Sequence, residues 1–63
     1  MISIEKVIGG YEAHATPPHI REEWRTTSPM TANSLAAELL ARGAHQTDIG
    51  DAFSAADPNW ISN

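Results

Sequence analysis

The chain is only 63 residues long and contains no cysteine. A chain of this length buries only about 60% of its unfolded surface, so a single core leaves it marginally stable. Small domains usually gain stability from disulfides, a metal or a partner, and the missing cysteine excludes disulfides and thiolate zinc sites. Alanine supplies much of the 41% hydrophobic fraction and brings little area to bury. We therefore expect a larger protein partner, or a second copy of the chain, to contribute to stability.

The charge and hydropathy of the chain indicate where in the cell it acts and which partners it can bind. The net charge of −4 disfavours non-specific attraction to nucleic acid or anionic lipid. No apolar run approaches the roughly 20 residues needed to cross a bilayer. The first ten residues also lack the basic region and long apolar stretch of a secretory signal. Together with the missing cysteine, these features predict a cytoplasmic protein that binds no membrane, with nucleic acid disfavoured as a partner.

Helical apolar stripes separated by proline and glycine breaks predict an all-α fold. We expect a small bundle of three or four short helices in one domain over residues 1–63, with 57–63 as a short C-terminal tail. The expected core consists of the large apolar side chains on these stripes: Ile4, Val7, Ile8, Ile20, Trp24, Leu35, Leu39, Leu40, Ile49 and Phe53.

The N-terminal segment allows two structures. Ile4, Val7, Ile8 and Tyr11 follow the i, i+3, i+4, i+7 spacing of one helical face. Two adjacent glycines interrupt that face, and each costs about 1 kcal/mol in a helix interior. The alternative is a strand over residues 1–8. We expect the helix and keep the strand as the alternative.

The middle of the chain is expected to hold a short helix over residues 19–26. A proline disfavours helical backbone in the residue before it, so this helix can begin near Pro18 but not much earlier. Ile20 and Trp24 lie one turn apart and form its apolar face.

The clearest helical signal covers residues 34–43. Ser28 followed by Pro29 is a suitable N-cap and first-turn pair, and Thr31 is an alternative cap. Gly43 is expected to end the helix in the left-handed position that glycine favours.

A last short helix is expected between Thr47 and Pro58. Thr47 would cap its start, and Ile49 and Phe53 lie on one apolar stripe. Pro58 stops the helix, because the residue before a proline is driven out of the helical region.

The two helices within residues 31–56, joined at a glycine, resemble a helix-turn-helix in outline. In a DNA-binding version, Arg42, Gln46 and Thr47 would reach the DNA. Residues 32–63, however, contain one basic residue against four acidic residues. Phosphate contacts supply most of the affinity in DNA binding, and this surface would repel phosphates. A small DNA-binding regulator is therefore the alternative function and not the first.

The sequence shows no pattern typical of a catalytic or metal site. His14 and His19 are five residues apart, which is not the i, i+4 spacing that places two ligands on one helical face. His45 and Asp48 form only a weak pair of potential ligands. No nucleophile elbow and no phosphate-binding loop is present. We expect a non-enzymatic protein without a cofactor or metal.

The two tryptophans are the strongest functional candidates. Trp24 and Trp60 are large for so small a core, and tryptophan is enriched at the energetic centres of interfaces. Arg21 and Arg25 flank Trp24 and complete a candidate anchor. The sequence thus predicts a small protein that binds a larger protein, as inhibitors, antitoxins, adaptors and phage-type modulators do. A less favoured alternative is a ribosomal peptide precursor with a helical leader.

Overall fold

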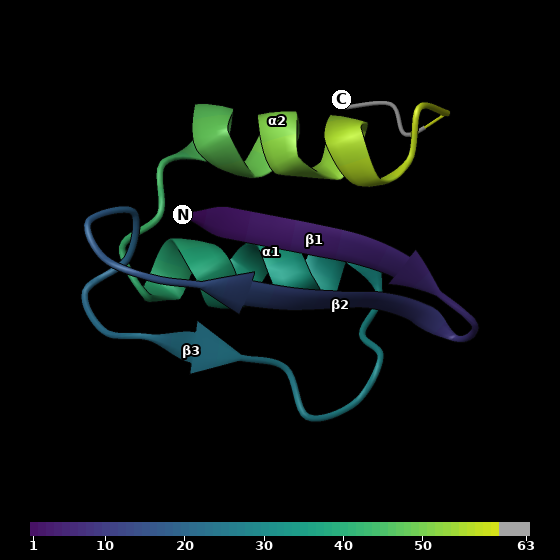
Figure 1. Cartoon of the computed structure of the whole chain (residues 1–63), viewed down its shortest axis with the longest axis horizontal. Coiled ribbons are helices and arrows are strands. Elements are labelled where there is room, and N and C mark those ends of the chain that lie inside the picture. The colour runs from purple at the N-terminus through teal and green to yellow at the C-terminus, as the bar shows by residue number, and fades with distance from the viewer. Residues whose placement is uncertain (60–63) are drawn as a thin grey trace.

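The computed structural model describes residues 1–59, which form a three-stranded sheet and two helices (Figure 1). The elements are β1 (Ile2–Val7), β2 (Gly10–Ala15), β3 (Trp24–Arg25), α1 (Ala32–Ala41) and α2 (Gln46–Ala56). The sheet is antiparallel with the strand order β1-β2-β3. The fold is therefore α+β, and the expectation of an all-α, wholly helical bundle is wrong.

The hairpin of β1 and β2 replaces the helix expected at the N-terminus. Val7 pairs with Gly10, so Ile8 and Gly9 form a two-residue turn. Gly10 has a φ of +142°, and a Cβ there would lie 2.3 Å from the carbonyl oxygen of Met30. Only glycine fits this position. The strand alternative is confirmed, and Ile8, expected in the core, is fully exposed in the turn.

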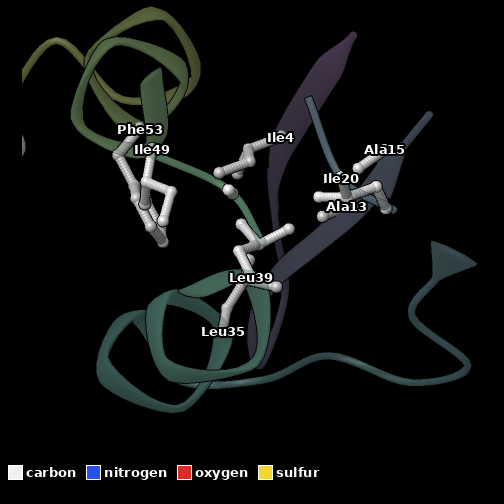
Figure 2. Close-up of a cluster of buried hydrophobic side chains, with 9 residues drawn as sticks. Ile4, Ala13, Ala15, Ile20, Leu35, Leu39, Ile49 and Phe53 are labelled. Carbon is white, nitrogen blue, oxygen red and sulfur yellow. The ribbon is translucent and has the colours of Figure 1, made fainter. Parts of the chain in front are cut away.

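Alternation along the hairpin gives the sheet one apolar and one polar face. Ile4 pairs with Ala13, and both are buried beneath the helices. Glu5 pairs with Glu12 on the opposite face. Both helices lie on the apolar face (Figure 2). This two-residue period decides the structure, because it buries apolar groups that a helix could not bring to one side.

The segment between β2 and β3 contains turns and bends, so the helix expected over residues 19–26 is wrong. Ile20 is buried as expected, with only 2% of its surface exposed. Trp24 and Arg25 form β3 and pair with the end of β2. Pairing of β3 with the β1–β2 hairpin prevails here, because the helical pattern rested only on Ile20 and Trp24, which are one turn apart.

The start and end of α1 follow local signals. The Thr31 hydroxyl accepts a hydrogen bond from the backbone N–H of Ser34 at 3.2 Å, so Thr31 is the N-cap and Ser28 is not. Gly43 follows the helix with a φ of +107°, which confirms its expected role.

The second helix begins slightly earlier than expected. His45 occupies the N-cap position of α2, so the predicted cap at Thr47 is wrong. The helix ends at Ala56, and Asp57 has extended backbone before Pro58, as the proline predicted.

The helices lie side by side and run in opposite directions. Figure 1 shows α1 behind β2 and α2 beside β1, and Figure 2 shows both helices end on. The helical hairpin expected within residues 31–56 is present. Its antiparallel arrangement differs from the steep crossing, about 90–120°, of a DNA-binding helix-turn-helix. Both helices cover the sheet and form one layer.

Within residues 1–59, the core between the helices and the sheet contains nine buried apolar residues: Ile4, Ala13, Ala15, Ile20, Leu35, Leu39, Ala44, Ile49 and Phe53 (Figure 2). Six of these were expected. Val7 and Trp24 are only partly buried. Leu40 is 47% exposed, because Leu35 and Leu39 occupy the side of α1 that faces the sheet.

Candidate interaction surface

Arg21, one of the predicted partner-binding residues, stabilises the end of α1. Its Nη2 donates a hydrogen bond to the carbonyl oxygen of Ala41 at 2.6 Å. Its backbone N–H also donates to the carbonyl oxygen of Arg42 at 3.1 Å. A cation at a helix C-terminus satisfies free carbonyls and interacts favourably with the helix dipole. Arg21 therefore has a structural role in the fold.

Trp24 and Arg42 were expected to serve different functions, and the structure brings them together. The guanidinium of Arg42 lies 4.3 Å from the centroid of the Trp24 ring. Arg42 also forms an ion pair with Glu38 at 3.2 Å. The partly buried Trp24 ring packs against the core. This pair thus fastens β3 to the end of α1 through a cation–π contact.

The remaining predicted residues do not gather into one surface. Arg25 lies on the polar face of the sheet, opposite His14 of β2. Gln46 and Thr47 are exposed in the first turn of α2. Trp60 lies outside the described residues.

A groove lies between the start of β1 and one face of α2. Its volume is about 460 Å³. We call it the β1–α2 groove; its lining residues are Met1, Ile2, His19, Asp48, Asp51, Ala52 and Ala55. The four residues from α2 occur at i, i+3, i+4 and i+7, so they share one face of the helix. The groove has a small apolar floor and two carboxylates.

The outer edge of β1 borders this groove. Met1 and Thr16 exchange two backbone hydrogen bonds, which sets the alternation of bonding along the hairpin. The backbone N–H and C=O groups of Ile2, Ile4 and Lys6 consequently point away from β2. Within residues 1–59, no backbone hydrogen bond reaches these groups. β1 therefore presents an edge on which a further strand can pair.

A small polar network lies at the far end of β1 and α2. The buried Asp57 carboxylate accepts hydrogen bonds from Lys6 Nζ and Tyr11 Oη, each at 3.1 Å, and from the Asn59 backbone N–H at 3.0 Å. The Asn59 and Lys6 hydrogen bonds hold the pKa of the Asp57 carboxyl below its usual value. The hydrogen bond and charge of Asp57 raise the pKa of Lys6. The network ties the end of α2 to the hairpin.

The Tyr11 side chain joins this network to the core. Its ring packs edge-on against Phe53 with 5.2 Å between ring centroids. Burial, and then the hydrogen bond to Asp57, raise the pKa of its hydroxyl. Tyr11 therefore holds the polar network against the apolar layer.

Two other hollows are less suited to a ligand. A hollow of about 310 Å³ on the polar sheet face contains Glu5, Glu12, His14 and Arg25. Its His14 Nε2 already lies 2.7 Å from a Glu23 carboxylate oxygen. A hollow of about 240 Å³ beside Trp24 and Arg42 borders the cation–π pair. Neither hollow borders the outer edge of β1.

Comparison with known proteins gives no guide to the activity. No family model, no curated protein and no solved structure matches the chain. Residues 1–59 contain no helix long and apolar enough to cross a membrane. The same residues hold no group of three or more histidine, aspartate or glutamate side chains placed to hold a metal ion.

Sequence reasoning missed the β1–α2 groove. Its residues come from the chain start, the segment after β2 and α2, and no local pattern joins them. One signal was available in the alternative of a strand over residues 1–8: a strand at the start of the chain has a sequence neighbour to pair with on one side only. An open edge followed from that alternative, and the residues at its start, Met1 and Ile2, line the groove.

Proposed function

We propose that this protein is a non-enzymatic binding module that takes up an extended segment of a larger protein partner. The segment pairs with the outer edge of β1 and lies against α2 in the β1–α2 groove. This is binding by strand addition, and it replaces the helical contact that an all-α fold would use. The encounter is placed in the cytoplasm, as the cysteine-free sequence predicts.

The observation that supports this proposal most directly is the free edge of β1 beside a hollow. In strand addition, backbone hydrogen bonds provide affinity, and pockets beside the edge select alternate side chains. The edge supplies the backbone groups of Ile2, Ile4 and Lys6, and the groove supplies a small apolar floor from Ala52 and Ala55. An edge strand of six residues usually needs protection from other chains.

The positions of the basic residues favour a protein partner over DNA. The chain has four lysine and arginine residues. Lys6 binds Asp57, Arg42 binds Glu38, and Arg21 binds the end of α1. Arg25 alone has no such contact within the described residues. Few cations are left to contact phosphates, which supply most of the affinity of a DNA-binding protein.

The test is selection of peptides from a displayed random library, followed by hydrogen exchange of the bound protein. A selected peptide should slow exchange of the amides of Ile2, Ile4 and Lys6, since these become bonded only on binding. Slower exchange elsewhere, with these three amides unchanged, would place the site on another surface.

A matched pair of variants tests whether the selected peptide binds in the β1–α2 groove. Ala55→Trp fills the groove, whereas Ala37→Trp adds the same side chain to an exposed position of α1. The first should abolish peptide binding and the second should leave it unchanged. Equal binding by both variants would contradict the proposed function.

A further inference from the structure

The acidic side chains of the β1–α2 groove lack a basic partner in the described part of the chain. Asp48 and Asp51 line the groove, and no ion pair forms at either carboxylate within residues 1–59. The other titratable groups in the lining are His19 and the N-terminal ammonium of Met1, which donates to the carbonyl oxygen and the hydroxyl of Thr16, each at 3.1 Å. The two carboxylates outnumber this one ammonium and form no ion pair with it, so the groove keeps an excess of negative charge.

The lysine and arginine side chains of this protein lie outside the groove. Lys6, the base on the same strand, is bound to Asp57 at the far end of β1. The Arg21 guanidinium donates to the end of α1, and Arg42 lies over Trp24. The Met1 ammonium is one cation against two carboxylates in the lining, so a basic side chain of a bound segment would complement the remaining negative charge.

The spacing of Asp48 and Asp51 determines how many basic side chains of a bound segment can pair with them. Asp48 and Asp51 are three residues apart on a helix, which is about 4.5 Å along its axis. Side chains on one face of a strand repeat every two residues, about 6.8 Å. The strand repeat is longer than the axial separation of the two acids, so one basic side chain placed between them can interact with both. A single basic side chain between the two carboxylates fits this distance.

The floor of the groove determines which type of residue fits at the next same-face position of the bound segment. Ala52 and Ala55 lie about 6 and 10.5 Å beyond Asp48 along α2. α2 runs in the same direction as β1, so these alanines follow the acids along the strand edge (Figure 1). One strand repeat past the basic side chain, the bound segment meets methyl groups. Small alanine side chains leave room there for an apolar residue.

We propose that the β1–α2 groove selects a basic segment, with one lysine or arginine between Asp48 and Asp51 and an apolar residue one strand repeat away. This inference rests on the proposed function, because it assigns the side chains of the strand that β1 accepts. The occupant is a segment of a larger protein. A second copy of this chain is a competing outcome that the test resolves.

The experiment compares three synthetic peptides of equal length. In each, serine fills one face of the strand, and the other face alternates valine with lysine, with serine or with glutamate. Binding is followed by fluorescence anisotropy at low and high salt. The lysine peptide should bind most tightly and the glutamate peptide least, and salt should reduce the difference. Sedimentation of the free protein should show a monomer.

Two double variants distinguish the effect of charge in the groove from the effect of the net charge of the protein. Asp48→Asn with Asp51→Asn should weaken binding of the lysine peptide about three- to tenfold. Glu12→Gln with Glu22→Gln changes the net charge by the same amount away from β1 and the groove and should leave binding unchanged. Equal weakening by both would overturn the assignment to the groove.

The outcomes distinguish the two proposals. If the serine and lysine peptides bind equally, and Ala55→Trp abolishes both, strand addition stands and the preference for a base is wrong. If no peptide binds, both proposals are wrong. If the free protein is a dimer whose β1 edges protect each other from hydrogen exchange, a second copy occupies the groove and both proposals are overturned.

Discussion

The two edges of the sheet differ in length and in what lies beside them. β1 is six residues long, and its outer edge borders the β1–α2 groove. β3 is two residues long, and its Trp24 is held by Arg42. A very short edge strand with a charged residue is a common protection against unwanted pairing. β1 also carries charged residues, Glu5 and Lys6, but its length leaves the backbone groups of Ile2, Ile4 and Lys6 open to pairing. The difference in length therefore indicates a stabilising role for the β3 edge, and we propose binding at the β1 edge.

The largest expected effect concerns the apolar layer beside β1. Phe53 is fully buried, so Phe53→Ala should lower the free energy of unfolding by about 3–5 kcal/mol. Urea denaturation measures this loss, with the exposed Ser54→Ala as the control. A loss below about 1 kcal/mol would mean that the β1 side is not packed as described.

A smaller loss is expected from Gly10→Ala in the hairpin. The new Cβ would meet the backbone of Met30, and the φ of +142° strains any other residue. We expect a loss of about 1–3 kcal/mol. Gly50, whose Cβ would meet nothing, is the matched control, and Gly50→Ala should stabilise α2 by about 0.5–1 kcal/mol. Thermal unfolding of the two variants should move in opposite directions.

Trp24→Ala tests the comparison from the β3 side. It removes the contact with Arg42 and part of the packing against the core, so stability should fall by about 1–2 kcal/mol. Binding of the lysine peptide, measured below the unfolding transition, should not change. If this variant weakens binding as strongly as Ala55→Trp, the binding surface includes the β3 edge and the contrast between the edges fails.

The smallest expected effect is the pH dependence of the Asp57 network. The pKa of Asp57 is lowered by folding, so its contribution is present above the model-peptide value of 3.8 and is lost as pH falls through the folded pKa. The pKa values of Lys6 and Tyr11 are raised, so their contributions are present below 10.5 and 10.0 and are lost as pH rises further. Stability should therefore be flat between these limits and fall outside them.

Asp57→Asn provides the control for this profile. It removes the titrating carboxylate while keeping an oxygen that can accept a hydrogen bond. The variant should lose the acid limb that is due to Asp57 and should be less stable at neutral pH. An unchanged acid limb in urea titrations at several pH values would show that other carboxylates cause it.

The two ends of the chain also differ in how far their structure could be predicted. The positions of α1 and α2 followed from Gly43, Pro58 and a hydroxyl near residue 31. The expected core from Leu35 to Phe53 was largely correct, with Leu40 as the exception. The N-terminal segment, with a strand over residues 1–8 as the alternative, and residues 19–26 were expected to be helical and form strands and turns instead.

The difference between the halves comes from the range of the forces that act on each. Helix caps, glycine stops and proline stops act within a few residues, so the sequence alone determined where α1 and α2 lie. A strand becomes stable only when a partner strand pairs with it and helices cover its apolar face. Tertiary structure therefore decided that Ile2 and Ile4 belong to a strand. It also placed Asp48 and Asp51 beside that strand's free edge and brought Arg42 over Trp24, because each of these contacts joins segments that are distant in the sequence.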